Sequence, residues 1–271
     1  MAMKITKQGR RLFLLGLASY LVFMFVSVPA SFLTRYILPR VEAARSLKLQ
    51  NVHGSIWNGE ANDARLASFD LGKLDWELSG WGLITGNVKL KLKAKNESSH
   101  ASGHVTLGFD GMFDASDVAL AFPAETLQPL FYGFPISIAG EVSGRLEQLS
   151  YLEDELLIAE GRLLWQGAAL RAPQNIELGD FEINFTPHNN GSKIKLTDRG
   201  DGPVKAEINV RIDGKGKYGM NGWLQARDAS QQHITEALRV LGRADNSGRY
   251  WVAYSGSFSK QSQRGRGRRI R

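Results

Sequence analysis

Apolar and polar residues alternate along most of this chain. In Val88-Lys89-Leu90-Lys91-Leu92-Lys93, three lysines share one face and three aliphatic residues the other. The same period recurs in Val105/Leu107/Phe109, Val118/Leu120/Phe122, Ile136/Ile138, Phe181/Ile183/Phe185 and the run 204–212. Short turn signals separate these segments, such as Asn-Gly at 190–191 and Asp-Gly at 213–214. From Leu47 to Phe258 the pattern predicts a mainly β protein with antiparallel strands.

Two short helices are expected within this β region. Pro123 to Gln128 predicts one turn that ends before Pro129, because proline cannot continue a helix. The segment from Ala229 to Leu241 has apolar residues along one face, with Asp228 as its N-cap and Gly242 as its stop. The expected fold is therefore β with one or two small helical insertions.

The N-terminal segment has no alternation and is continuously apolar. Arg11 and Arg35 bracket the uncharged stretch Leu12–Thr34, which as a helix reaches roughly 34 Å and exceeds a hydrocarbon core of about 30 Å. We expect residues 12–34 to be a transmembrane anchor. The alternatives are a cleaved signal peptide, whose cleavage site would be Val28-Pro29-Ala30, and a buried soluble helix. The apolar run up to Val28 is longer than the roughly 7–15 residues of a signal peptide.

The orientation of this anchor is less constrained than its position. Lysines and arginines are equally frequent on its two sides, so the positive-inside rule does not decide. The short, acid-free tail of residues 1–11 favours a cytoplasmic N-terminus. Residues 35–258 would then lie in the periplasm, which predicts a single-pass protein of the inner membrane.

The net charge of +7 is concentrated at the two ends of the chain. Lys4 to Arg11 carries four positive charges, and Lys260 to Arg271 carries six without any acid, which leaves the body at −3. A nucleic-acid-binding body would carry a basic face of its own. We expect residues 259–271 to be a disordered tail, whose arginines resemble an RNA-binding segment but could equally meet anionic headgroups or remain solvated.

A tryptophan–glycine motif occurs twice. The first copy contains Gly54, Trp57 and Gly59 and is followed by a strand containing Trp76; the second contains Gly161, Trp165 and Gly167. Because an alternating Leu-Gly strand follows each copy at nearly the same distance, we predict an internal duplication, with halves of about 47–140 and 141–258. The tryptophans could be partner-binding hot spots, although a repeated core position explains the repetition more directly.

Residues for catalysis or metal binding do not form a convincing set. The chain has no cysteine, and its five histidines are scattered. His100 and His104 lie four residues apart and could share a strand face as a weak zinc site, but solvated loop histidines are the simpler interpretation. His53, His188 and His233 stand alone, and the acidic run Glu153-Asp154-Glu155 reads as a solvated turn. We expect no catalytic site, metal, cofactor or small-molecule substrate.

These motifs resemble a known family, the type II secretion system protein N of the general secretory pathway in Gram-negative bacteria. The matching residues, within positions 10–258, are Pro29-Ala30, Val52-x-Gly54-x-Ile56-Trp57-x-Gly59-x-Ala61, Leu71-Gly72-x-Leu74-x-Trp76-x-Leu78, Gly161-x-Leu163-Leu164-Trp165-x-Gly167-Ala168, and Leu241-Gly242 with Tyr250. The tail after Phe258 is not part of the family pattern. The resemblance implies a non-enzymatic inner-membrane protein with a periplasmic β domain, which accompanies the machine that exports folded proteins.

The function expected from this resemblance is support of secretion through protein contacts made by sheet edges or faces. Possible partners are the secretin and the inner-membrane platform, besides the lipid of the inner membrane. The competing hypothesis is a lipid-handling envelope protein whose curved sheet holds acyl chains. Such a groove requires apolar residues on one face beyond those needed for a core.

Overall fold

The computed structural model describes residues 7–37, 46–84, 86–108, 111–131, 137–152, 155–172, 175–189, 191–239 and 242–257. In this part of the chain all strands belong to one sheet of 13 strands, and each strand pairs antiparallel with the next one in sequence. The strands are β1 (Leu47–Gly54), β2 (Asn58–Leu66), β3 (Phe69–Ser79), β4 (Asn87–Lys95), β5 (His100–Gly108), β6 (Met112–Pro123), β7 (Ser137–Leu152), β8 (Glu155–Ala172), β9 (Ile176–Pro187), β10 (Gly191–Asp198), β11 (Val204–Asp213), β12 (Lys217–Ala226) and β13 (Tyr250–Ser257). The mainly β, antiparallel fold expected from the alternation is thereby confirmed.

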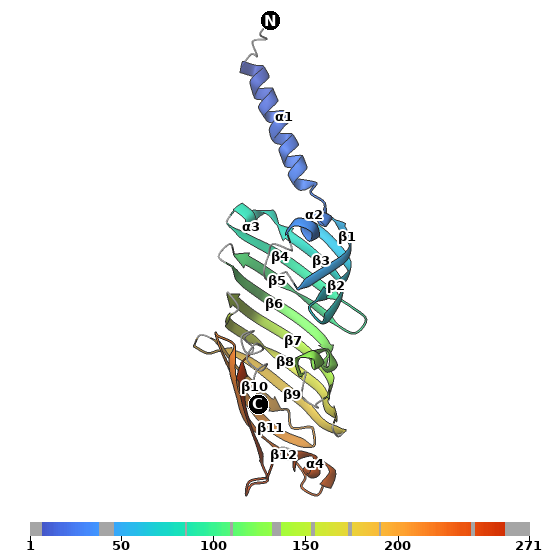
Figure 1. Cartoon of the computed structure of the whole chain (residues 1–271), viewed down its shortest axis with the longest axis vertical. Coiled ribbons are helices and arrows are strands. Elements are labelled where there is room, and N and C mark those ends of the chain that lie inside the picture. The colour runs from blue at the N-terminus through green and yellow to red at the C-terminus, as the bar shows by residue number, and fades with distance from the viewer. Residues whose placement is uncertain are drawn as a thin grey trace, which may run out of the picture.

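The sheet is long and narrow, because a chain that always pairs with its predecessor extends the sheet by one strand at a time. Figure 1 shows β1 to β3 next to the N-terminal helix and the last strands at the opposite end. The boundary expected between the two halves, at 140/141, lies inside β7, so both halves contribute to one continuous sheet. The duplication itself stays a prediction.

The predicted alternation of β4 sets the two faces of the sheet. Lys89, Lys91, Lys93 and Lys95 are exposed, whereas the residues between them are half-buried. Directly paired residues of neighbouring strands share a face, and the pairing carries the aliphatic side of β4 across the sheet. We call this side the apolar face and the lysine side the polar face. The apolar face includes Trp76, Leu92, Val105, Leu120, Val142, Leu163, Phe181, Leu196, Ile208 and Met220.

The N-terminal apolar segment forms helix α1 (Lys7–Val26), followed by the short helix α2 (Ala30–Phe32) and a π-helical turn, Leu33–Ile37. The helix ends before Pro29 because proline lacks the backbone donor and disfavours helical geometry in the residue before it. The segment 12–34, expected to be one transmembrane helix, is instead divided among α1, α2 and the π-helical turn. No helix in the described ranges is both long enough and apolar enough to span a bilayer.

The short helices differ in detail from the expectations. The predicted turn at 123–128 is a 3-10 helix, η4 (Ala124–Phe131), which continues past Pro129. The predicted helix 229–241 is shorter, α4 (Gln232–Leu238), and Asp228 is not its cap: its carboxylate accepts the backbone N–H of Ser230 instead. Helix α3 (Gly80–Ile84) was not expected. Leu241 lies outside the described residues, as do Phe109, Asp110, Ile136, Glu153, Asp154 and the tail from Phe258 onward.

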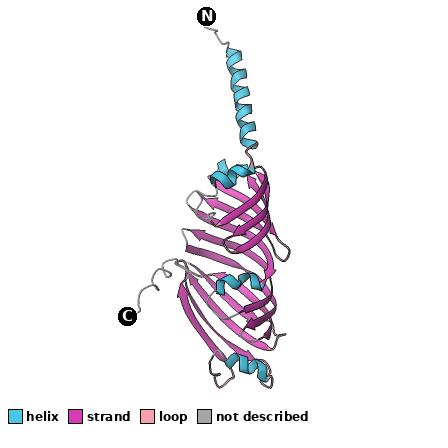
Figure 2. Cartoon of the chain, turned by 45° about the vertical axis from the view of Figure 1, so that its right-hand side comes forward, coloured by secondary structure: helices cyan, strands magenta, loops and turns pink. Residues whose placement is uncertain are grey.

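Three small hydrophobic clusters hold the sheet, and each contains a residue from a helix. Ala30 of α2 packs with Ala61 and Trp76. Ala124 of η4 packs with Ile138, Val142 and Leu163. Ile234, Ala237 and Leu238 of α4 pack with Phe181, Val204 and Tyr250. The helices are spaced along the sheet (Figure 2), so the core is divided into segments rather than enclosed by a second layer.

Candidate interaction surfaces

The first tryptophan–glycine motif forms the tight turn between β1 and β2. Gly54 has a φ of +86°, and a Cβ there would lie 2.6 Å from the carbonyl oxygen of Asn58. The backbone N–H of Ser55 donates to the same oxygen at 2.9 Å, and Ser55 Oγ accepts the N–H of Asn58 at 3.1 Å. Glycine at 54 is therefore required by backbone conformation and by close approach.

Trp57 lies in this turn and joins the sheet to α1. Its indole N–H donates to the carbonyl oxygen of Phe25 at 2.9 Å, and the two ring centroids are 4.6 Å apart. The N–H of Ile56 donates to the oxygen of Val28 at 3.1 Å, and Pro29 forms a β-bridge with Ser55. We call these contacts the helix–sheet junction. They fix the end of α1 against the first turn of the sheet.

Gly59 and Trp76 form the buried side of the same turn. Trp76 is 3% exposed, and its indole N–H donates to the oxygen of Ile56 at 3.2 Å. A Cβ on Gly59 would lie 2.5 Å from the Trp76 ring. The turn between β1 and β2 thus brings together the four residues of the first motif and its following strand, Gly54, Trp57, Gly59 and Trp76.

The second motif lies in the middle of the sheet, within β8. Trp165 is half-buried, donates to the oxygen of Ala139 at 3.0 Å and packs on Phe181 with ring centroids 5.9 Å apart. Gly167 has a φ of +56°, and its N–H donates to Asp180 at 2.8 Å. Gly161 has a φ of +154°, and a Cβ there would meet the neighbouring strand β7. Trp165 contacts two of the three clusters and is a core residue.

The two motifs do not occupy matching places in the strand register. Gly72 and Gly179 both have a positive φ and lie opposite Ala64 and Ala168, respectively. Two residues after each glycine, Leu74 pairs with Ala61, whereas Phe181 pairs with Trp165. Trp57 lies in the turn four residues before Ala61. The tryptophans therefore have different roles, one at the helix–sheet junction and one in the central core.

The apolar face carries more aliphatic surface than the three clusters bury. Outside the clusters, several of its aliphatic side chains are only half-buried, namely Val105, Leu107, Ile208 and Val210. A cleft of about 250 Å³ opens near η4 and is lined largely by apolar side chains of β2, β3, β6 and η4, including Leu66, Phe69, Leu71, Leu120, Phe122 and Leu127. This excess is the feature that the groove hypothesis requires.

The polar face carries exposed ion pairs. Lys73 Nζ lies 2.7 Å from Glu60 Oε2; this hydrogen bond and the positive charge lower the pKa of Glu60. The same hydrogen bond raises the pKa of Lys73, with the negative charge of Asp75 adding to it. On the apolar face, by contrast, burial raises the pKa of the Tyr218 hydroxyl, and the neighbouring Tyr254 raises it further. The Lys73–Glu60 pair of the polar face is exposed to solvent. Exposed pairs of this kind contribute little to stability.

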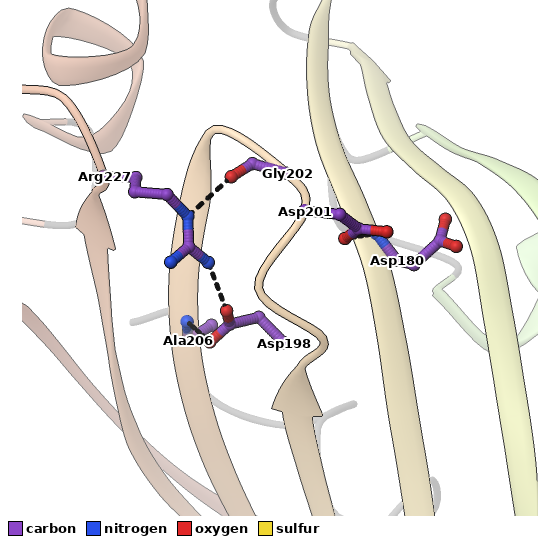
Figure 3. A network of polar contacts seen from close by, with 6 residues as sticks. All are labelled: Asp180, Asp198, Asp201, Gly202, Ala206 and Arg227. Carbon is purple, nitrogen blue, oxygen red and sulfur yellow. Dashed lines mark hydrogen bonds and ion pairs between the residues drawn. The ribbon is translucent and has the colours of Figure 1, made fainter.

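A more enclosed network ties the end of β12 to the turn between β10 and β11 (Figure 3). Arg227 forms an ion pair with Asp198 and donates from Nε to the oxygen of Gly202 at 2.8 Å. Asp198 also accepts the N–H of Ala206 at 3.0 Å, and Asp201 accepts the N–H of Asp180 at 3.4 Å. Because each charged group has a partner, the network serves to fix the strands rather than to bind an ion.

Histidines and carboxylates do not converge in the described residues. His100 and His104 are exposed on β5, opposite Lys95 and Lys91, respectively. His188 is exposed next to Asn189, and His53 and His233 lie on other elements. Within the described ranges, no three or more residues of the metal-ligating types come together.

Two features escaped the sequence analysis. Phe25 is the partner of Trp57 but lies 32 residues away in sequence, so no local pattern connects them. The second feature is that β13 is the edge strand farthest from β1, which follows from the strand order and not from its own residues. The absence of charged residues in Tyr250–Ser257 could be read from the sequence.

Comparisons with known proteins agree on one family. The family model described as "Type II secretion system (T2SS), protein N" matches residues 45–253. The chain is 27% identical to type II secretion system protein N of Aeromonas hydrophila over 247 residues, covering 89% of this chain and 96% of the relative. It is 26% identical to the protein of the same name in Klebsiella pneumoniae over 262 residues, covering 93% and 97%, respectively. No solved structure matches the chain.

The family match covers most of the chain and includes both tryptophan–glycine motifs. The expectation of a non-enzymatic secretion component is confirmed by this match. The chain belongs to the type II secretion system protein N family.

Proposed function

We propose that this component of the type II secretion system is anchored in the inner membrane by the apolar side chains of α1, within the expected segment 12–34, and supports export through protein contacts made by its periplasmic sheet. The helix–sheet junction carries the proposal. Trp57 and Ile56 donate hydrogen bonds to backbone carbonyl oxygens at the end of α1 and just after it. These bonds fix the helix directly to the first turn of the sheet.

The side chains of α1 support the anchor. From Arg11 to Val26 all of them are exposed, including Leu12 at 70%, Phe13 at 68% and Phe23 at 70%. Figure 1 shows this helix projecting away from the sheet without covering it. A row of exposed apolar side chains on a projecting helix is unfavourable in water and favourable in lipid.

Single cysteines test this arrangement, since the chain has no native cysteine. We expect Ser98→Cys, at an exposed position in the turn after β4, to react with a membrane-impermeant maleimide in spheroplasts and Ala2→Cys to react only after the membrane is opened. Both variants should stay in the membrane fraction after alkaline carbonate extraction. Release by carbonate, or the reverse labelling pattern, would contradict the proposed anchor and orientation.

The apolar face favours a second candidate function, the binding of acyl chains. The cleft bordered by Leu66, Phe69 and Phe122 is open to solvent and lined largely by apolar side chains, as an aliphatic ligand requires. It faces the same side of the sheet as the half-buried aliphatic residues, which could extend the contact along the strands.

A fluorescent polyene fatty acid serves as the probe for this candidate. We expect saturable binding to the purified full chain and a Kd about tenfold higher in Leu66→Asp, since a carboxylate in the cleft opposes apolar contact. Leu66 is 40% exposed, so the change should leave the fold intact. Trp81→Asp, at an 81% exposed position on α3, is the matched control. Equal binding by all three proteins, or none by the wild type, would exclude the cleft.

A further inference from the structure

In the described part of the chain the sheet ends in an edge strand, β13 (Tyr250–Ser257), that contains neither a charged residue nor a proline. β13 reads Tyr-Trp-Val-Ala-Tyr-Ser-Gly-Ser and has no charged residue. It pairs with β12 on one side; on the other, the described residues provide only a bridge from Ala244 to Tyr250. Beside Trp251, Ala253 and Ser255, no strand in the described ranges pairs with this side of β13. Natural edge strands commonly carry charges, prolines or bulges that prevent such exposure.

The opposite edge of the sheet is different. β1 contains Lys48, and Asn51 has a φ of +50°, which interrupts the regular strand. Ser55, at the end of this strand, is bridged by Pro29, and α2 packs nearby. Each edge strand thus has a bridge at one end, but β1 also carries a charge and a backbone irregularity and has α2 beside it, whereas β13 carries neither a charge nor a positive-φ residue.

The open edge is also held in a fixed conformation. Asp245 accepts hydrogen bonds from the N–H groups of Ser247 and Arg249 and from the Trp251 indole at 2.9 Å. The indole bond is the main reason that the pKa of Asp245 is lowered. Arg249 lies 4.5 Å above the ring of Trp223, which pairs with Trp251 across the strands. An ordered strand loses little entropy when it binds.

We propose that β13 is a docking edge for an extended segment of another envelope protein, which adds to the sheet as a further strand. Main-chain hydrogen bonds would provide the affinity. Side chains of the segment would alternate between the polar face, beside Trp251 and Ala253, and the apolar face, beside Val252. The matching segment is therefore uncharged, with apolar residues at every second position.

The position of the edge argues against a second copy of this chain, and this step rests on the proposed anchor. Thirteen strands about 4.8 Å apart place β13 on the order of 60 Å from β1, measured along the sheet. Two chains joined through their β13 edges would have their α1 helices at opposite far ends of one sheet (Figure 1). Both helices could not enter the same membrane, so the partner is a different protein that reaches this chain far from the inner membrane.

Photo-crosslinking in cells that make the complete secretion system tests the docking edge. A photoreactive phenylalanine analogue replaces Trp251, Ala253 or Ser255, which share the polar face of β13. We expect all three to cross-link to one segment of another secretion protein, at residues that advance by two per step, as strand pairing requires. The same analogue at Gln50 in β1 should give no such adduct.

A charge on the edge separates strand addition from general surface binding. Ala253→Lys should lower the cross-linking yield of the Ser255 analogue at least about tenfold and reduce export in proportion. Asn221→Lys places the same charge opposite Ala253 on the paired strand β12 and should change neither. Both positions are exposed, so the urea midpoint of each variant should match the wild type.

The other outcomes overturn the docking edge. Adducts with a second copy or with residues 258–271 of the same chain would show that the edge is covered by this protein itself. Cross-links without the two-residue step would show surface contact rather than strand addition. Normal export by Ala253→Lys, with the expected cysteine labelling, would remove the docking edge and leave the membrane anchor standing.

Discussion

Replacement of Phe181 by alanine is expected to lower the free energy of unfolding by about 3–5 kcal/mol, the range for a buried aromatic side chain. Phe181 is 2% exposed and belongs to the cluster that joins β9 to α4. It shares this cluster with Ile234 and Leu238 of α4 and with Tyr250 of β13, so alanine at position 181 would leave a cavity among large apolar side chains. Urea unfolding of the full chain in detergent, followed by tryptophan fluorescence, measures the change.

The control for this experiment is Trp81→Ala, which removes an aromatic ring at an 81% exposed position. Its free energy of unfolding should change by less than about 0.5 kcal/mol. If Phe181→Ala also lost less than about 1 kcal/mol, the cluster around α4 would not be a stabilising core. The end of the sheet that carries β13 would then lack the rigidity required of a docking edge.

The strands could be predicted from the sequence because their side chains alternate. In β4 each lysine is exposed and each intervening aliphatic residue is half-buried, as the period of two requires. The same local rule located the strands around Phe181 and Val204. Short-range pattern is sufficient wherever one face of a strand is apolar and the other is solvated.

The boundaries of the helices were less predictable because tertiary contacts decide them. Pro129 was expected to end its helix, but a 3-10 helix accommodates it. Asp228 has the right chemistry for a helix cap, yet its carboxylate closes a local turn with Ser230. At Asp228 a local hydrogen bond thus competes with the predicted cap, and propensity alone does not rank the two.

The candidate surfaces depend on contacts that no local pattern contains. Trp57 was identified as a special residue, but its partner Phe25 lies in a different element, and Trp165, its counterpart in the repeat, has another environment. The open edge exists because every strand pairs with its predecessor, which leaves β13 last. The absence of charge in β13 can be read from the sequence, whereas its position at the edge of the sheet follows only from the strand order.

The second large effect is expected at the centre of the sheet, where Gly161→Ala should lower the free energy of unfolding by about 3 kcal/mol. Gly161 has a φ of +154°, which L side chains rarely adopt, and strain of this kind costs about 1–3 kcal/mol. An added Cβ would also lie 2.6 Å from both the carbonyl oxygen of Arg145 and the Cα of Leu146. Relieving that clash requires β7 and β8 to separate, at a further cost of about 1–3 kcal/mol.

Gly219→Ala provides the matched control for Gly161→Ala. Gly219 also lies within a strand, β12, but nothing lies within 4 Å of an added Cβ, and its φ is outside the left-handed region. The same chemical change should there leave the free energy of unfolding unchanged or raise it by about 0.5 kcal/mol, since alanine restricts the unfolded chain. Equal losses at both positions would show that the loss at Gly161 does not come from the close contact between β7 and β8. A loss at Gly161 alone would show that the motif's glycine is required for the contact between the two longest strands. The continuity of the sheet from the helix–sheet junction to β13 depends on that contact.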